Sequence, residues 1–345
     1  MARQHRLSPA IPLIRAAPVR AFVNRLGEWG VPVGRLLERA RLSQRVLIEG
    51  DAEALVPLVS VGRFLEDAAR SQGVEDLGFR LGTSIEVRNL GLFGRMLEAG
   101  PSLGDALARA CRHWSAFDSG ERCWITRCGE GVEVHHQYLH DAATTWEQGK
   151  GVALALYLKY IAAAAGPGWY PTSIGVPLRA LPGAHAHPLL AKARLELGRP
   201  WMTITVPASV LDRPFPRLRG LEAPLQSRSW DENLPAGDVG GALQQVVTAF
   251  LADGYPDIQL VADAVGLSTR TLQRRLHEDG RTYAGVVAQA RFAEARRLLR
   301  DPARKVIDVA LDLGYSDPAH FTRAFERWAG VPPREFRRLA FDRAH

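Results

Sequence analysis

Hydrophobic residues recur at helical spacing in two similar stretches of the last third of the chain, residues 257–278 and 306–329. In each stretch, one helical pattern runs into a turn of Gly, an apolar residue and Ser, and a second helical pattern follows. These turns are Gly266–Ser268 and Gly314–Ser316. Gly suits the left-handed end of a helix, and Ser can cap the helix that follows. The two stretches therefore predict two helix-turn-helix units.

The second helix of each unit has an apolar face and a polar face. Leu272 and Leu276 lie on the apolar face of the first, and Phe321 and Phe325 on that of the second. The polar faces carry the candidate DNA-contacting residues Thr269, Arg270, Gln273, Arg274, Ala319, His320, Arg323 and Arg327. Arg and Gln can pair bidentately with guanine and adenine edges in a major groove. The alternative is a helical bundle with a solvated basic face, and two such units in register argue against it.

A long amphipathic pattern, roughly residues 283–299, separates the two units. Such a helix would hold them at a fixed separation. At about 34 Å, the rise of one turn of B-DNA, both second helices would enter successive major grooves on one face of the duplex.

The first two-thirds of the chain mixes helical and alternating patterns and predicts an α+β domain. The expected elements are mostly helices over 18–115, a hairpin of 123–128 and 132–137, a helix at 145–165, strands at 173–176 and 201–206, and a short helix at 188–193. The predicted organisation is a disordered arm at 1–17, an effector-sensing or dimerisation domain at 18–213, a Pro- and Gly-rich linker at 214–240 and a DNA-binding domain at 241–345.

The last hundred residues resemble the DNA-binding domain of AraC/XylS-type transcription regulators. The resemblance rests on Ala262, Gly266–Ser268, Leu272–Arg274, Arg291–Phe292, Gly314–Tyr315, Phe321, Arg323, Phe325, Pro332–Pro333 and Phe336–Arg337, among others. It implies that the second helices read bases. Ala319 is small where some members of the family carry a longer polar residue, so it would offer a thymine only a methyl contact.

Roughly residues 20–215 resemble the arabinose-binding N-terminal domain of one branch of the same family. The matching pieces are Val33–Leu37, Leu77–Gly82, Leu90–Gly94, Ser102–Leu107 and Pro200–Trp201. The resemblance implies a transcription regulator, here taken as an activator, that responds to a small effector. Its expected partners are double-stranded promoter DNA, RNA polymerase and a second copy of the chain. The label does not establish arabinose as the ligand.

The N-terminal domain is rich in aromatic residues that would suit an apolar effector pocket. They are Trp114, Trp124, Trp146, Trp169, Tyr170 and Trp201. The alternative is that these residues are ordinary core and that the protein is a constitutively dimeric DNA-binding protein without an effector. The several Arg residues would suit a carboxylate ligand, although such residues usually lie at the surface.

Composition adds little that is specific. The net charge of +7 fits a polyanion partner, but residues 241–345 contribute only +3 of it, with 16 Lys and Arg against 13 Asp and Glu. Three cysteines make no disulfide framework, and no signal peptide or membrane-spanning run is evident, so a cytoplasmic location is expected.

The sequence gives only weak support for a metal site, a redox site or an enzyme. Cys123 and Cys128, or His135, His136 and His140, would make a metal or redox site only if strand alternation did not separate them. There is no Gly-x-Ser-x-Gly motif and no phosphate-binding loop. The sequence therefore predicts no enzyme, no catalytic residue, no metal site and no cofactor. A nucleoid-type DNA-binding protein would have no use for the large N-terminal domain.

Overall fold

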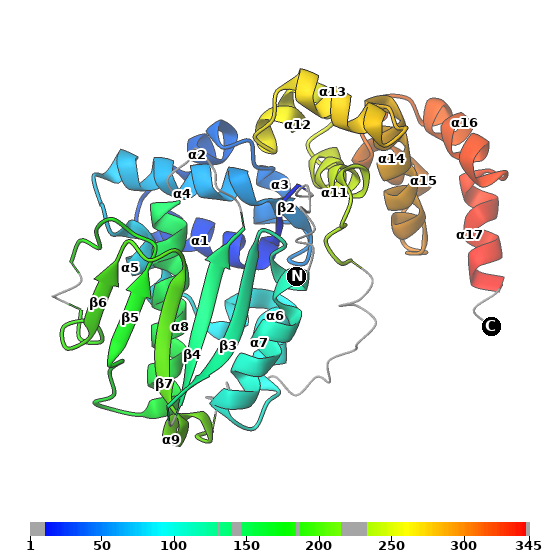
Figure 1. Ribbon diagram of the computed structural model, residues 1–345. Helices are drawn as coiled ribbons and strands as arrows, with labels where there is room; N and C mark the ends of the chain where they lie inside the picture. Colours follow the sequence, from blue (N-terminus) through cyan, green and yellow to red (C-terminus); the bar gives the residue numbers. More distant parts are fainter. Residues whose placement is uncertain (1–10, 130, 140–145, 184–186, 215–232, 343–345) are drawn as a thin grey trace.

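The computed structural model describes residues 11–129, 131–139, 146–183, 187–214 and 233–342. An N-terminal domain of helices and a five-stranded sheet precedes a helical C-terminal domain (Figure 1). The predicted fold class is confirmed: an α+β domain followed by two helix-turn-helix units joined by a long helix.

The first part of the N-terminal domain is mostly helical, as its hydrophobic spacing predicts. Strand β1 (Leu13–Arg15) pairs antiparallel with β2 (Leu55–Pro57). The helices are α1 (Ala16–Glu28), α2 (Val33–Arg39), α3 (Gln44–Ile48), α4 (Leu58–Gln72), α5 (Leu77–Ser84), η1 (Val87–Leu90), α6 (Gly91–Glu98) and α7 (Leu103–Phe117).

The predicted disordered arm, residues 1–17, is wrong for the part that the structure describes. Residues 1–10 lie outside the described residues. Ile11, Leu13, Ile14 and Arg15 are all buried, because β1 pairs with β2 and packs between the two domains. The stretch looked like an arm in the sequence because its partners lie far along the chain.

The second part of the domain is a sheet with strand order β3-β4-β7-β5-β6. Its strands are β3 (Glu121–Cys128), β4 (Gly131–Tyr138), β5 (Ser173–Val176), β6 (Arg194–Leu197) and β7 (Met202–Pro207). The predicted hairpin is β3 and β4, and the predicted strands 173–176 and 201–206 correspond to β5 and β7. Residues 188–193 form turns rather than the predicted helix, and they lead into β6, an edge strand parallel to β5 that sequence reasoning missed.

Helix α8 (Glu147–Ala165) lies against the sheet, and α9 (Ala208–Leu211) ends the domain (Figure 1). Helix α5 crosses α8 at very short range. A Cβ added at Gly78 would lie 2.0 Å from the backbone oxygen of Gln148, so only glycine fits there. The Gln148 side chain accepts a hydrogen bond from the Gly78 amide at 2.7 Å, and this contact fixes the position of α8.

The C-terminal domain consists of seven helices in the described residues. They are α11 (Val239–Leu251), α12 (Ile258–Ala264), α13 (Thr269–Glu278), α14 (Tyr283–Leu299), α15 (Val306–Asp312), α16 (Pro318–Ala329) and α17 (Pro333–Asp342). Helix α11 starts two residues before the expected boundary at 241, and most of the expected linker, 215–232, lies outside the described residues. Gly266 and Gly314 both have φ near +72°, the left-handed conformation that the turn signals required.

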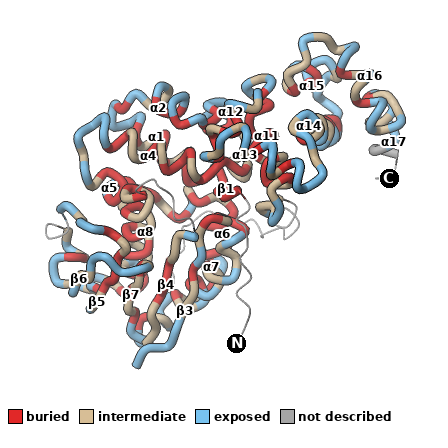
Figure 2. Tube along the Cα trace, turned by 45° about the horizontal axis from the view of Figure 1, so that its top comes forward, coloured by how far each residue is buried: buried red, intermediate tan, exposed pale blue. Residues whose placement is uncertain are grey.

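The two-stranded ribbon of β1 and β2 contributes to the hydrophobic cores of both domains. Leu13 and Leu55 belong to the same buried cluster as the C-terminal helices, whereas Ile14 and Val56 belong to the N-terminal cluster. Successive side chains of a strand point to opposite faces, so a ribbon lying between two domains can serve both. Figure 2 shows β1 as a buried segment beside α11.

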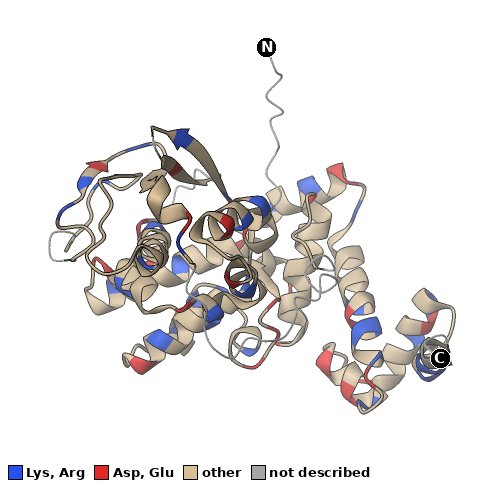
Figure 3. Cartoon of the chain, turned by 90° about the horizontal axis from the view of Figure 1, so that it is seen from below, with Lys and Arg blue, Asp and Glu red and all other residues tan. Residues whose placement is uncertain are grey.

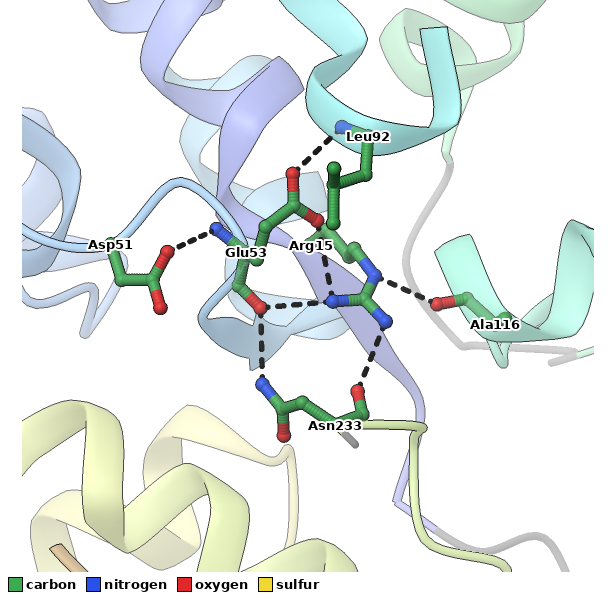
Figure 4. Close-up of polar contacts among 6 residues, drawn as sticks. All are labelled: Arg15, Asp51, Glu53, Leu92, Ala116 and Asn233. Carbon is green, nitrogen blue, oxygen red and sulfur yellow. Dashed lines mark hydrogen bonds and ion pairs between the residues drawn. The ribbon is translucent and has the colours of Figure 1, made fainter. Parts of the chain in front are cut away.

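Arg15, the last residue of β1, is fully buried and holds this region together (Figure 4). Its guanidinium donates to the carbonyl oxygens of Ala116 at 2.9 Å, Glu53 at 3.2 Å and Asn233 at 3.0 Å. The Glu53 carboxylate lies 3.3 Å from the same guanidinium and accepts a hydrogen bond from the Leu92 amide. Arg15 thereby connects α7, α6, the segment before β2 and the segment before α11.

Burial of this pair is costly for both charges. Desolvation lowers the pKa of Arg15 and raises the pKa of Glu53. A buried ion pair of this kind adds little net stability compared with an apolar replacement, but removing one partner leaves an uncompensated charge. We therefore interpret the pair as fixing the position of β1 rather than as a main source of stability.

The shared ribbon predicts that an N-terminal residue stabilises the C-terminal core. Leu13→Ala should lower the free energy of unfolding by about 2–5 kcal/mol, since it leaves a cavity in a fully buried site. Urea unfolding of the full chain would measure this loss. Leu197→Ala is the matched control, because Leu197 is 46% exposed, and it should cost far less. Equal losses in the two variants would contradict the shared core.

Candidate nucleic-acid interface and ligand cavity

Helix α13 presents the first group of predicted site residues. Ser268 caps the helix by accepting a hydrogen bond from the Thr271 amide at 3.2 Å. The buried side chains of Leu272 and Leu276 hold its inner face against the C-terminal core. The opposite face is solvent-accessible: Arg270, Gln273 and Arg274 are exposed, and Thr269 is half-buried. Arg274 pairs with Glu278 one turn along, at 2.6 Å.

Helix α16 presents the second group in the same manner. Asp317 caps it by accepting a hydrogen bond from the Ala319 amide at 2.8 Å, and Pro318 occupies the first turn. Phe321 and Phe325 are buried. Ala319, His320, Arg323 and Arg327 are all exposed. The structure thus places all eight predicted residues on two helix faces, four on each.

Helix α14 links the two units through one side chain. The Arg291 guanidinium donates to the carbonyl oxygen of Gly314, in the turn of the second unit, at 3.1 Å. It also lies over the rings of Tyr315, 4.4 Å from the centroid, and Tyr255, 5.0 Å from the centroid, just before α12. Cation–π contacts of this kind stabilise a fixed arrangement, so Arg291 helps to set the position of one unit relative to the other.

The first unit packs on the N-terminal domain, whereas α16 and α17 extend away from it (Figure 1). Ser60 of α4 donates to the carbonyl oxygen of Ala264 at 2.9 Å, and Arg63 donates to that of Asp263 at 2.5 Å. Arg45 donates to the carbonyl oxygen of Ala252 at 2.8 Å. These carbonyls lie at the ends of α12 and α11, where helices leave acceptors without an internal partner. Figure 3 shows Lys and Arg on both domains, so charge alone does not mark the interface.

The N-terminal domain contains a partly open cavity of about 130 Å³ between α1, α4, α6, α7, α8 and the start of β3, called the N-terminal cavity below. Its walls are mainly aliphatic and aromatic. Two of the six predicted pocket aromatics, Trp114 and Trp146, line it. The remaining four, Trp124, Trp169, Tyr170 and Trp201, are not among its lining residues. Sequence reasoning missed Phe93, Phe117, Tyr138, Tyr157 and Tyr160, which also line it.

Two carboxyl groups interrupt the apolar wall of the cavity. Asp118 is fully buried; its Oδ1 accepts a hydrogen bond from the Gly120 amide at 2.8 Å, and its Oδ2 has no hydrogen-bond partner. Glu121 Oε2 lies 3.1 Å from Nε2 of His136. The indole Nε1 atoms of Trp114 and Trp146, two further lining residues, are likewise buried without a hydrogen-bond partner. Such atoms are rare in folded proteins and point to an absent polar partner.

Burial shifts the titration of these groups toward their neutral forms. Desolvation, with a further contribution from Glu121, raises the pKa of Asp118 well above its ordinary value. Desolvation also raises the pKa of Glu121 to about 8 and lowers the pKa of His136 to about 3. Burial therefore favours the neutral form of both carboxyl groups, because no opposite charge among the described lining residues compensates them.

The cysteine and histidine residues considered for metal or redox chemistry do not come together in one site. Cys123 is buried and Cys128 exposed, as expected for positions five apart on a strand. His135 stacks on Trp124 and contacts the Thr126 hydroxyl, whereas His136 contacts Glu121. His140 lies outside the described residues. Within the described ranges, no group of three or more His, Cys, Asp and Glu has the arrangement of a metal site.

Comparison with known proteins identifies the family. Residues 30–215 match the model described as the arabinose-binding domain of AraC transcription regulator, N-term, and residues 261–339 match a helix-turn-helix domain model. The first match covers more than half of the chain. The protein belongs to the AraC family of DNA-binding transcription regulators, and it is a regulator rather than an enzyme.

Several relatives align along nearly the whole chain. The ornithine utilization regulator of Pseudomonas aeruginosa is 24% identical, over 94% of this chain and 96% of its own length. The regulator VirS of Mycobacterium tuberculosis is 22% identical over the same shares. The activator RhaS of Escherichia coli O157:H7 is 34% identical over 33% of this chain and 41% of its own. The crystal structure of CdpR from P. aeruginosa, 20% identical, matches 90% of this chain and 98% of its own with a TM-score of 0.39.

None of the described helices combines the length and hydrophobicity that a membrane span requires.

The raised pKa of Glu121 predicts a pH-dependent stability. Between its unfolded value of 4.5 and its folded value of about 8, the folded state keeps a proton that the unfolded chain releases. Glu121 therefore makes the free energy of unfolding fall as pH rises, by up to about 1.4 kcal/mol per pH unit. His136 has the opposite effect only below its ordinary pKa of 6.5. From pH 6.5 to 8 the decline therefore reports on the buried carboxyl groups, and a variant of Glu121 separates its share from that of Asp118.

In that window Glu121→Gln should flatten the decline of stability with pH, measured by urea unfolding at several pH values. Glu28→Gln, a change at an exposed site on α1, is the control and should leave the slope unchanged. The same slope in wild type and Glu121→Gln would show that Glu121 is already ionised at pH 6.5.

Proposed function

We propose that this AraC-family protein inserts α13 and α16 into successive major grooves of a specific DNA site and responds to a small effector in the N-terminal cavity. Support for DNA reading comes from the two capped helices, each with an exposed Arg-bearing face, on one scaffold. Helix N-termini in a major groove bring their first residues to the base edges. Arg270, Gln273 and Arg274 would read one half of the site, and Ala319, His320 and Arg323 the other.

Thr269 and Arg327 lie at the ends of these two faces and suit contacts with phosphates. The ion pair between Arg274 and Glu278 is exposed, so exchanging it for a guanine contact costs little. The DNA site should be asymmetric, because the two helices differ in sequence. A regulator of this kind would also contact RNA polymerase and a second copy of the chain, and both belong to this proposal.

The N-terminal cavity supports a response to an effector. A constitutive dimer without an effector, the alternative, would have no use for a cavity whose described lining residues include three buried polar atoms without a hydrogen-bond partner. The β1–β2 ribbon offers a direct route to the DNA-binding domain. Ile14 lines the cavity, while its neighbour Leu13 packs in the C-terminal core. A ligand that shifts Ile14 would therefore shift a residue on which α11 packs.

One relative is named for ornithine utilization, which raises the question of an amino-acid effector. The described lining residues of the cavity include two carboxyl groups and no Lys, Arg or His. Nothing among them would compensate the carboxylate of an amino acid. The cavity therefore disfavours an amino acid, and also the carboxylate ligand that the Arg-rich composition allowed.

The DNA-reading proposal predicts sequence-dependent losses of affinity. Arg274→Ala should cost roughly 1–3 kcal/mol on the specific site and relax the preference at one or two base pairs. Arg323→Ala should do the same in the other half of the site. Affinity measurements on a selected site and on random DNA would test this.

Arg300→Ala is the control for charge, because Arg300 is exposed at the end of α14 and lies outside both recognition faces. It should change binding to specific and random DNA alike, and only slightly. If Arg274→Ala and Arg323→Ala also weakened both kinds of DNA equally, the two residues would be phosphate contacts and not base readers.

The effector proposal predicts that filling the cavity abolishes the response to ligand. In a thermal-shift screen of the full chain against a metabolite library, a true effector at 100 times its Kd should add about 2.7 kcal/mol of stability. Ala110→Leu places a larger side chain in the cavity wall and should remove that stabilisation while leaving the fold intact. The effector should also change DNA affinity. A screen without any stabilising compound would favour the constitutive dimer.

A further inference from the structure

The N-terminal cavity has a chemistry that narrows the class of its ligand. All but a few of its described lining residues are apolar, and the charged groups among them are both acidic, Asp118 and Glu121. Asp118 directly follows α7 and Glu121 is the first residue of β3, so they lie close together in sequence and on one side of the cavity. One end of the ligand should therefore be polar and the rest apolar.

The polar side of the cavity lacks a positive charge. Asp118 Oδ2 has no hydrogen-bond partner, although the atom is buried. Desolvation raises the pKa of both carboxyl groups, and the Glu121 charge further raises that of Asp118. An ammonium group would donate a hydrogen bond to Asp118 Oδ2, and its positive charge would lower the pKa of both carboxyl groups and so favour their ionised forms.

The aromatic lining favours a cation as well. Trp114, Tyr138 and Tyr157 line the cavity on the same side as the acids, and His136 packs edge-on against Trp114 with a centroid distance of 4.9 Å. The faces of Trp and Tyr rings attract ammonium groups. His136, with its pKa lowered to about 3, stays neutral and does not repel a cation.

The size of the cavity limits the apolar part of the ligand. A cavity of about 150 Å³ lined by Leu, Ile and Phe holds one benzene molecule, and this cavity measures about 130 Å³. Its apolar wall includes the stacked rings of Phe93 and Phe117, with centroids 4.3 Å apart. The apolar part therefore has the size of a single six-membered ring or a short branched chain.

We propose that the N-terminal cavity binds a small primary amine with one compact apolar group, whose ammonium contacts Asp118 and Glu121. This inference rests on the proposed effector function of the same cavity and adds the class of ligand. An anion would face two carboxyl groups with no described cation in the lining. A neutral alcohol would satisfy one hydrogen bond but would not stabilise the ionised form of either acid.

Three probes of nearly equal size and different charge test the ligand class: benzylamine, benzyl alcohol and benzoate. Their binding to the full chain would be measured by calorimetry and thermal shift. We expect benzylamine to bind at least tenfold more tightly than benzyl alcohol, and benzoate not to bind. Asp118→Asn keeps the oxygen that accepts from Gly120 and removes the carboxyl group that a bound ammonium would ionise, so it should lower benzylamine affinity at least tenfold and leave benzyl alcohol affinity unchanged.

Glu121→Gln is a second variant that should also lower the affinity for benzylamine. Glu133→Gln is the control, because Glu133 does not line the cavity. If benzyl alcohol or benzoate bound as well as benzylamine, or if Asp118→Asn and Glu121→Gln bound benzylamine like wild type, the amine class would be overturned. Failure of all three probes to bind would overturn it too.

The effector function would still hold if another compound stabilised wild type but not Ala110→Leu. Binding of benzylamine with unchanged DNA affinity would support the amine site and contradict its regulatory role.

Discussion

The position of strand β1 is the constraint on which the arrangement of the two domains depends. Three consecutive residues serve three purposes: Leu13 packs in the C-terminal core, Ile14 lines the N-terminal cavity, and Arg15 binds carbonyl groups from three separate segments. Strand alternation makes this division possible, because neighbouring side chains must point in opposite directions. The buried guanidinium then fixes the register, since a shift by one residue would leave its charge without partners.

The two helix-turn-helix units are held unequally. The first packs on α4 through hydrogen bonds to carbonyl oxygens at the C-terminal end of α12, whereas the second is attached through α14, Arg291 and the turn at Gly314. Any movement of the N-terminal domain therefore acts first on α12 and α13. Because α14 is a continuous helix that joins the two units, such a movement would carry the second unit along with the first.

The N-terminal cavity and the DNA-binding domain are neighbours through β1 and through α4, which begins at Leu58 in the cavity wall and contacts α12 at Ser60 and Arg63. The cavity combines apolar walls with buried acids whose protonation burial favours. Burying such groups costs stability. A protein that needed this domain only for dimerisation would gain stability from apolar residues in their place, and this cost is part of the support for the proposed effector site.

The sequence by itself determined the elements whose signals are local. Helical spacing, the turn glycines and the capping Ser268 and Asp317 predicted both helix-turn-helix units and the exposed faces with Arg274 and Arg323, because a helix places residues three and four apart on one side whatever surrounds it. Only the tertiary structure decided the rest. Residues 11–17 are ordered by pairing with β2 some forty positions away, and the cavity joins Ile14, Asp118 and Trp146 from distant segments. Contacts between positions so far apart leave no periodic trace in a sequence, since each depends on how independently formed elements pack.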